Sequence, residues 1–329
     1  MSSSADISLE DVQARRPALQ VSLSRVGVTG VEKVIRIRTG DTEQLFWAAL
    51  ECVIDLGPEQ KGAHMSRFEE VVNDVVGEAV LGEAAFRAEE LARRIAEEVR
   101  ERQQARRADV RIRARYPEHK PAPVSGIPTQ ELYTLHGIAV ASEAGTRRIV
   151  GVTAQGMTAC PCAQQLVEAR ARERLSGDGF SEAEIARIVD SVPIATHNQR
   201  GLGTLWIGRT ESGADDIDAR QLLDIVEGSM SSEIYELMKR SDEGAVVEKA
   251  HRRPRFVEDV VREMIGGVVE QLPELGDDSF VRAHQENLET IHQHNVVAER
   301  SGLLGEIRRE IETGDHSAEH LAMDDWLEA

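Results

Sequence analysis

The sequence predicts an α+β protein in which antiparallel sheets carry helices on one face. Apolar runs with strand-like alternation and apolar runs with helical spacing come in groups along the chain, which is typical of this class. The order strand, strand, helix, helix, strand, strand over residues 19–145 is repeated with additions over residues 146–305, which favours two tandem modules. The chain has 329 residues, of which 41% are hydrophobic, so it can bury cores of this size.

The first module is predicted at residues 19–145, after a polar segment at 1–18 that we expect to be flexible. Partial alternation of apolar and β-branched residues indicates its strands, and we expect the first strand to be bulged or broken at Gly27 or Gly30. The expected elements are strands at 19–38 and 46–56, helices at 68–80 and 86–99, and strands at 110–116 and 132–141.

The second module is predicted at residues 146–305 and contains a helical insert at 163–193. An acidic tail at 306–329 follows the module. The repeat concerns the order of elements, since the two halves share no detectable sequence identity. The expected elements are a strand at 149–158, helices at 163–175 and 181–192, a strand at 202–210, helices at 219–239 and 257–272, and one or two strands within 280–298.

Charge, hydropathy and cysteine content exclude several classes of protein. The formal net charge is −19, so the chain will not bind nucleic acid by bulk attraction, and a phosphate ligand would need a local basic pocket. No apolar run is long enough to cross a membrane, and residues 1–6 do not resemble a signal peptide. Three cysteines cannot all pair with one another, which argues against a disulfide framework and for the reducing cytoplasm.

A Cys-Pro-Cys segment at residues 160–162 stands between a predicted strand and a predicted helix. If the segment is extended, Cys160 and Cys162 point the same way, so one sulfur can bind a metal while the other lies beside a substrate. Pro161 fixes the backbone between them. The spacing is too short for most closed zinc sites. The alternative is a pair of buried thiols that pack as small apolar groups.

His197 and Glu233 are the other candidate metal ligands. His197 lies among polar residues at 196–200, directly before a predicted strand, and such a cluster is costly to bury without a purpose. Glu233 falls beside the apolar stripe of the helix predicted at 219–239, where a carboxylate can complete a metal shell. Thiolate, imidazole and carboxylate together suit zinc or ferrous iron. Ordinary structural or surface roles are the alternative for both residues.

Further candidates for substrate binding and proton transfer lie near the end of the second module. Glu248 follows two valines, and a buried carboxylate can clamp the row of N–H donors on a guanine edge. Glu289 precedes His292 and His294, which share one side if this segment is a strand and would then be a ligand pair or a proton relay. A surface position for Glu248 and a coincidental pairing of the histidines are the alternatives.

A basic segment before the first predicted helix is a candidate phosphate site. It contains Lys61, His64, Ser66 and Arg67. Such residues near a helix N-terminus can hold phosphate, because free backbone N–H groups and the helix dipole point there. The segment lacks the glycine pattern of a phosphate loop, and a plain helix start is the alternative.

Taken together, these motifs resemble those of the type IB GTP cyclohydrolases. The resemblance implies a tunnelling fold (T-fold) and a homotetramer with active sites at subunit interfaces. It also implies a hydrolase that converts GTP, by attack at C8, to formate and 7,8-dihydroneopterin triphosphate in pterin and folate biosynthesis. The segments that carry the resemblance lie at residues 62–67, 156–162, 196–200, 232–235, 255–259 and 289–294.

The resemblance implies a role for each candidate residue. The ligands of one divalent metal ion per subunit, which is zinc, ferrous iron or manganese, would be Cys160, His197 and Glu233. The groups beside the reacting imidazole ring would be Cys162, Glu289 and His292. The guanine anchor would be Glu248, and the residues that face the phosphates or ribose would be Lys61, His64, Ser66 and Arg67.

One part of the sequence departs from the compact bacterial members of that family. The additional helical stretch at 175–192 looks more like the archaeal, iron-using branch, which forms 7,8-dihydroneopterin 2′,3′-cyclic phosphate instead of the linear triphosphate. Two other classes remain as alternatives: a non-catalytic pterin- or purine-binding protein of the same fold, and a thiol redox enzyme. The usual redox motif has two residues between its cysteines, whereas this chain has one.

Overall fold

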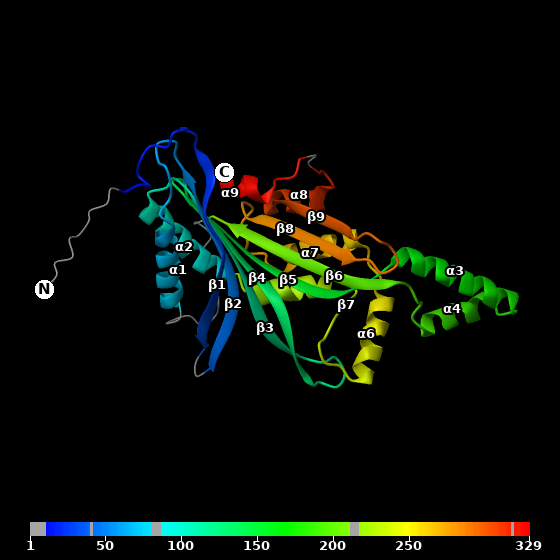
Figure 1. Cartoon of the computed structure of the whole chain (residues 1–329). Coiled ribbons are helices and arrows are strands. Elements are labelled where there is room, and N and C mark those ends of the chain that lie inside the picture. Colours follow the sequence, from blue (N-terminus) through cyan, green and yellow to red (C-terminus); the bar gives the residue numbers. More distant parts are fainter. Residues whose placement is uncertain (1–10, 40–41, 80–86, 211–216, 317–318) are drawn as a thin grey trace. The chain divides into compact units, whose positions relative to one another are not determined.

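A computed structural model of the chain describes residues 11–39, 42–79, 87–210, 217–316 and 319–329 (Figure 1). The chain divides into two compact units. Unit 1 runs to Arg113 and includes Gly137–Arg148, whereas unit 2 consists of Ala114–His136 and Ile149–Ala329. In the described parts of the chain, every helix is too short or too polar to span a lipid bilayer.

Unit 1 combines antiparallel strands with two helices. Its strands β1 and β2 pair with Ile35 opposite Phe46, and both side chains are buried. Helical spacing brings Phe68, Val71 and Val75 to the buried face of α1. The elements are β1 (Leu23–Thr39), β2 (Thr42–Leu56), α1 (Met65–Ala79), α2 (Ala88–Gln103), and the portions within this unit of β3 (Ala108–Pro121), β4 (Pro128–Ser142) and β5 (Gly145–Ala159).

The first strand carries the irregularity that its glycines predict. The register of the β1–β2 pair shifts between Val28 and Val31, where Gly30 adopts a φ of +66° that favours glycine. Gly27 is required for a different reason, because a Cβ atom there would lie 2.1 Å from the carbonyl oxygen of Cys52. The predicted bulge is therefore confirmed.

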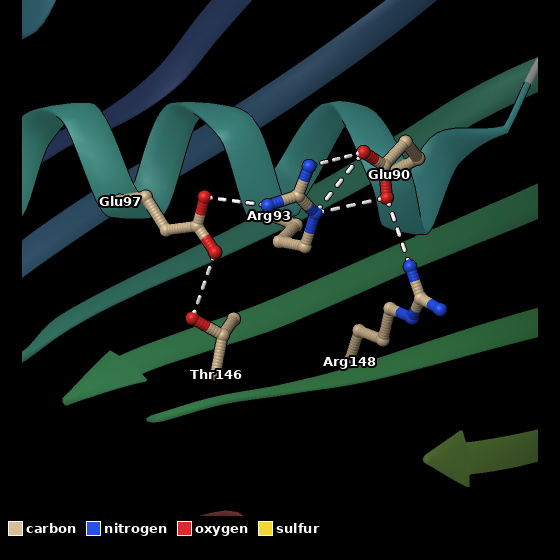
Figure 2. Close-up of polar contacts among 5 residues, drawn as sticks. All are labelled: Glu90, Arg93, Glu97, Thr146 and Arg148. Atoms are coloured by element: carbon tan, nitrogen blue, oxygen red, sulfur yellow. Dashed lines mark hydrogen bonds and ion pairs between the residues drawn. The ribbon is translucent and has the colours of Figure 1, made fainter. Parts of the chain in front are cut away.

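A network of ion pairs ties α2 to the start of β5 within unit 1 (Figure 2). Arg93 donates through Nε to Glu90 at 2.9 Å and through Nη1 to Glu97 at 2.6 Å. Arg148 also donates to Glu90, at 2.9 Å, and the hydroxyl of Thr146 donates to Glu97 at 2.9 Å. Burial acts to raise the pKa of Glu90, but Arg93 and Arg148 outweigh it and lower that pKa. The same contacts raise the pKa of Arg93, so the network stays charged.

Unit 2 is built on antiparallel strands in the order β3-β4-β5-β6-β8-β9, with β7 beside β5. Helices α5 and α7 pack over β6 and β8 and bury Val226, Val260 and Met264 completely. The strands not yet given are β6 (Asn198–Arg209), β7 (Ser232–Glu233), β8 (Phe280–Leu288) and β9 (Val296–Leu303). The helices are α3 (Pro161–Gly177), α4 (Glu182–Ser191), α5 (Ala219–Ser229), α6 (Arg240–Arg252), α7 (Val257–Gln271), α8 (Leu304–Thr313) and α9 (Met323–Glu328).

The insert predicted at 163–193 forms the helices α3 and α4, which project beyond the ends of β5 and β6 (Figure 1). The side chain of Ser181 and that of Glu184 form a reciprocal cap at the start of α4. Helix α3 has no buried residue, and it packs against α4. Its position in the chain matters for the site, since α3 begins directly after Cys160.

Helix α9 seals the core of unit 2 with an aromatic side chain. Trp326 stacks on Phe280 with the ring centroids 5.5 Å apart. Gly208 makes room for it, because a Cβ atom at that position would lie 2.7 Å from the Trp326 ring. Trp326 and Leu327 are 3% and 4% exposed. The segment predicted as an acidic tail therefore ends in a helix that is packed against the strands.

The predicted α+β class with antiparallel strands is confirmed, and most predicted elements are present. The helix predicted at 219–239 is wrong beyond residue 229: α5 ends at Ser229, because the chain then pairs with β5 as β7. Helix α6 has no counterpart among the predicted elements. The range 280–298 contains β8 and the start of β9. Residues 1–10 lie outside the described residues, and the tandem-module boundaries stay a prediction.

Candidate functional site

Cys160 lies at the junction of β5 and α3. Its backbone is extended and occupies the N-cap position, and Pro161 is the first residue of the helix, where a missing N–H group does no harm. Cys162 is already inside the first turn of α3 and is exposed, whereas Cys160 is partly buried. The prediction that both cysteines lie in one extended segment is therefore wrong, because Pro161 starts a helix between them.

The segment before β6 meets Cys160 through a reciprocal pair of hydrogen bonds. The backbone N–H of Cys160 donates to the carbonyl oxygen of His197 at 3.1 Å. The hydroxyl of Thr196 donates to the carbonyl oxygen of Cys160 at 2.8 Å. The structure thus joins the backbones of the candidate thiol and the candidate imidazole, whereas the meeting of their side chains stays a prediction.

A carboxylate and a second imidazole lie beside His197. The Nδ1 atom of His197 is 3.8 Å from Oε2 of Glu289, and both side chains are largely buried. The rings of His197 and His292 meet edge to face with centroids 6.3 Å apart, and His292 stacks on His294 at 5.3 Å. His292 and His294 lie in the loop between β8 and β9, so the prediction that they share a strand is wrong. Their rings nevertheless stack on one another.

Glu233 lies in β7, opposite Gly156 of β5, and not in a helix as predicted, because residues 230–233 leave the helix to pair with β5. The ammonium group of Lys249 is 2.5 Å from its Oε2 atom. Burial acts to raise the pKa of Glu233, but Lys249 and, more weakly, Lys120 outweigh it, so the net pKa is lowered. Glu233 is therefore a half-buried carboxylate held in its charged form.

Glu227, Lys120 and Tyr133 form a polar cluster near Glu233. The carboxylate of Glu227 accepts from Lys120 at 2.7 Å and from the hydroxyl of Tyr133 at 2.9 Å. Burial raises the pKa of Glu227 despite these partners. The ammonium group of Lys120 also lies 4.6 Å from the centre of the Tyr235 ring. Lys120 and Lys249 are thus the cations whose charges act on Glu233.

Glu248 lies on α6 and is exposed. Its carboxylate accepts from Arg252, one turn later, at 3.0 Å, and more than half of its side chain is accessible. Helix α6 is anchored at its other end by Asp242, which accepts from the backbone N–H groups of Val124 and Ser125 at 2.8 Å each. In this chain, the proposed guanine anchor is therefore a surface carboxylate on a firmly capped helix.

The candidate phosphate residues belong to unit 1, at the start of α1. His64 contacts Asp11 through Nε2 at 2.9 Å, and Arg67 donates to the carbonyl oxygen of Arg102 at 3.0 Å. Ser66 and Lys61 are exposed. These four residues lie around one helix N-terminus, and their contacts alone do not assign a role to any of them. The list of predicted phosphate contacts, Lys61, His64, Ser66 and Arg67, stays a prediction.

The residues near Cys160 fit a metal ion in part. The Nδ1 atom of His197 and Oε2 of Glu289 are buried and have no hydrogen-bond partner, which is the condition of donors that await a ligand. The donor types, thiol, imidazole and carboxylate, suit zinc or ferrous iron. Within the described ranges, however, no three His, Cys, Asp or Glu side chains come close enough together to hold an ion. Glu233, the third predicted ligand, is paired with Lys249 instead.

Several residues that shape this site were not singled out from the sequence. Gln164 donates through Nε2 to the carbonyl oxygens of Ile194 and His251, at 2.8 and 2.6 Å. The hydroxyl of Ser231 accepts from the backbone N–H of Ala159 at 3.1 Å. Each contact joins segments far apart in the chain, so no local pattern announces it.

Fold and site together define an α+β protein in which a cysteine and a histidine from distant segments meet at one end of antiparallel strands. The family model for type I GTP cyclohydrolase folE2 matches residues 9–298. The chain therefore belongs to the type I GTP cyclohydrolase folE2 family.

Individual relatives match along nearly their whole length. GTP cyclohydrolase MptA of Methanococcus aeolicus is 40% identical over 308 residues, which cover 92% of this chain and 99% of that protein. GTP cyclohydrolase MptA of Methanococcus vannielii is 41% identical over 309 residues, covering 92% and 98%. GTP cyclohydrolase MptA 1 of Methanocella arvoryzae is 39% identical over 309 residues, covering 93% and 97%.

Solved structures with a similar arrangement include uricases. Uricase from Arthrobacter globiformis gives a TM-score of 0.49 at 8% identity, covering 84% of this chain and 92% of that chain. A uricase from Bacillus fastidious gives 0.47 at 9% identity, covering 92% and 99%. A likeness at this level does not establish a shared fold, so the tunnelling fold stays a prediction.

Proposed function

We propose that this protein hydrolyses GTP at C8 of the guanine ring, releases formate, and forms 7,8-dihydroneopterin 2′,3′-cyclic phosphate. The motifs alone favour the linear triphosphate of the type IB enzymes as the main product. The strong match to MptA proteins of Methanococcus and Methanocella, which are archaea, favours the cyclic product of the archaeal branch instead. The single structural observation behind the proposal is the contact between Cys160 and His197.

We expect Cys160, His197 and Glu233 to hold one divalent ion, which would be zinc, ferrous iron or manganese. When bound, such an ion supplies a water that is activated near neutral pH. Glu233 must first part from Lys249 to take this role. The partnerless Nδ1 of His197 is the observation in the structure that supports the assignment.

The remaining residues would bind substrate and move protons. One water adds at C8 and opens the imidazole ring, and a second cleaves the resulting formamide to formate. His292 would pass protons to the ring nitrogens, and its position beside His197, in the loop that follows Glu289, supports this role. Cys162, exposed in the first turn of α3, would face the substrate from the other side.

The substrate contacts and the assembly extend the proposal. Glu248 would bind the guanine edge, and its exposure suits a site that a neighbouring subunit completes in a homotetramer with a tunnelling fold. The phosphate contacts would be Lys61, His64, Ser66 and Arg67. All three cysteines are unpaired, which suits a reducing cytoplasm.

Product analysis tests the proposal. The protein is incubated without oxygen with GTP and, separately, zinc, manganese or ferrous ions, and formate, pyrophosphate and the pterin mass are measured. A cyclic monophosphate keeps one phosphorus of the triphosphate, so pyrophosphate must appear in equal amount with formate. Formate without pyrophosphate would instead indicate the linear triphosphate, and no formate with any ion would refute both products.

A matched pair of cysteine variants tests the site. Cys160→Ala should abolish formate release and lower the metal content. Cys52 is buried in unit 1, where burial raises the pKa of its thiol to about 12, so Cys52→Ala should leave turnover intact. Full turnover of Cys160→Ala would contradict the proposed site.

A further inference from the structure

The segments that carry the candidate thiol and imidazole are joined at a single crossing. The Cys160 N–H group donates to the His197 carbonyl oxygen at 3.1 Å, and the Thr196 hydroxyl donates to the Cys160 carbonyl oxygen at 2.8 Å. The two bonds run in opposite directions across the same pair of segments. Together they restrict both the separation and the rotation of the two backbones, which one bond alone would not do.

The far side of the His197 segment is fixed to two helices. Gln164 of α3 donates to the carbonyl oxygen of Ile194 at 2.8 Å and to that of His251 at 2.6 Å. The imidazole of His251, at the end of α6, has Nε2 3.4 Å from the carbonyl oxygen of Thr196. The segment from Ile194 to His197 is therefore held from α3 and α6 as well as from Cys160.

The strand before Cys160 is fixed independently. The N–H group of Ala159 donates to the hydroxyl of Ser231 at 3.1 Å, and its carbonyl oxygen accepts from the backbone N–H of Arg255 at 2.9 Å. Both segments that meet at the crossing are thus held in place by further hydrogen bonds. The Thr196 hydroxyl is the side-chain group that binds the Cys160 carbonyl oxygen, so a single substitution removes one of the two bonds at the crossing.

We propose that Thr196 is a positioning residue, whose hydroxyl sets the placement of the Cys160 thiol relative to the His197 imidazole. The inference rests on the proposed function, because it assumes that these two side chains act together on one ion. Thr196 need not touch substrate or metal. A displacement of about 1 Å at a reacting centre can lower a rate by roughly 100-fold, which is the effect that the hydroxyl prevents.

The test uses the full-length protein and three substitutions. Thr196→Val keeps the shape of the side chain and removes the hydroxyl, whereas Thr196→Ser keeps the hydroxyl. Thr313→Val is the matched control, because the Thr313 hydroxyl makes the same kind of bond, to the carbonyl oxygen of Arg309 at 2.9 Å, on α8. We expect Thr196→Val to lower kcat by about 10- to 100-fold with KM changed by less than about 2-fold. Thr196→Ser should recover kcat to within about 3-fold of the wild-type value, and Thr313→Val should leave both constants unchanged.

A second measurement separates this inference from the proposed function. Cobalt(II) binding is followed by the charge-transfer absorption of a thiolate–cobalt bond, which needs no turnover. Weaker cobalt binding by Thr196→Val, restored in Thr196→Ser, supports the inference even if the wild-type protein releases no formate. Wild-type values of both kcat and cobalt affinity in Thr196→Val would overturn it. Equal losses in the Val and Ser variants would overturn it too, because the hydroxyl would then not be the cause.

A second variant at the same position guards against misfolding. If Thr196→Val does not fold, as judged by circular dichroism, Thr196→Ala removes the same hydroxyl and adds no bulk to the segment. The expected result is again a lower kcat and weaker cobalt binding with KM little changed. Unchanged kcat and cobalt affinity in a folded Thr196→Ala protein would overturn the inference.

Discussion

The Nδ1 atom of His197 faces the Oε2 atom of Glu289 across 3.8 Å, and neither atom has a hydrogen-bond partner. Both side chains are at least 86% buried, since their exposed fractions are 14% and 6%. A buried polar atom without a partner costs about 1–3 kcal/mol. An added ion that binds both atoms would therefore remove this cost.

Glu289→Gln should lower kcat by about 100-fold or more, because a neutral amide cannot stabilise the positive charge that develops on His292 during proton transfer as the carboxylate would. KM for GTP should change little. Steady-state formate release measures both constants. Glu312→Gln, an exposed change on α8, is the control and should behave as the wild-type protein. A Glu289→Gln protein with wild-type kcat would remove Glu289 from the chemistry.

Lys249→Met should tighten metal binding. The ammonium group of Lys249 forms an ion pair with the Glu233 carboxylate in this structure, so an incoming ion must displace Lys249. Because almost half of the Lys249 side chain is exposed, the pair is worth only about 0.2–1 kcal/mol, and the gain in affinity should be about 1.4- to 5-fold. Isothermal titration calorimetry with zinc gives the affinity. Arg252→Met, which frees Glu248 instead, should leave it unchanged, and a weaker affinity in Lys249→Met would exclude Glu233 as a ligand.

The stability that Asp242 provides should depend on pH. Burial acts to raise the pKa of Asp242, but the N–H and O–H donors of Ser125 and the N–H groups of Lys239 and Val124 outweigh it, so the net pKa is lowered. A lowered pKa in the folded state means that the contribution is complete above the unfolded carboxyl pKa of about 3.9 and is lost as the pH falls below it. Urea unfolding from pH 2 to 7 should therefore show wild-type and Asp242→Asn proteins converging only at the acidic end.

Asp259 offers the control for that experiment. Its carboxylate accepts from the backbone N–H of Phe256 at 2.9 Å at the start of α7, so it is also a helix cap. It lacks the contacts to the β3–β4 turn that Asp242 makes. Asp259→Asn should cost less stability at neutral pH than Asp242→Asn. Parallel unfolding curves for Asp242→Asn and the wild-type protein at every pH would show that the carboxylate charge is unimportant.

Arg93→Met should destabilise unit 1 by about 2 kcal/mol, because it removes charge-assisted hydrogen bonds and leaves Glu90 and Glu97 without their shared cation (Figure 2). Chemical denaturation monitored by circular dichroism measures the change. Arg102→Met is the control, since Arg102 is itself exposed and its ion pair with Asp74 lies at the surface, so its removal should change little. Equal effects of the two substitutions would mean that burial of the network is irrelevant.

Local pattern predicts most of the fold, and its main error has a physical cause. Apolar residues continue at helical spacing past residue 229, so periodicity alone extends α5 to 239. In the structure, Met230 is fully buried and Ser232 pairs with Met157 of β5. Tertiary pairing has overridden local preference there, and it moves Glu233 from a helix to a strand. Such an override depends on a partner more than seventy residues away, which spacing cannot reveal.

The approach of the candidate segments to one another was predictable from the sequence, but the residues that support these segments were not. Cys160, His197 and Glu289 were singled out because such residues bind metals or transfer protons and because they lie near the ends of predicted helices and strands. The structure places their segments together. The extended Cys-Pro-Cys geometry was wrong because proline at the first helical position favours a helix start. Thr196 and Gln164 escaped notice because their hydroxyl and amide act on distant backbone carbonyls, and nothing in their own surroundings marks that role.

The packing of Trp326 against Gly208 and Phe280 has a consequence for folding during synthesis of the chain. Strands β6 and β8 emerge from the ribosome well before the indole that covers them. Until translation has passed residue 327, that end of the nascent unit exposes apolar surface, which is the kind of surface that chaperones bind and that promotes aggregation. Folding of this unit is therefore completed late in synthesis, and a premature stop a few codons upstream should yield an insoluble product even though every residue of the candidate site has been made.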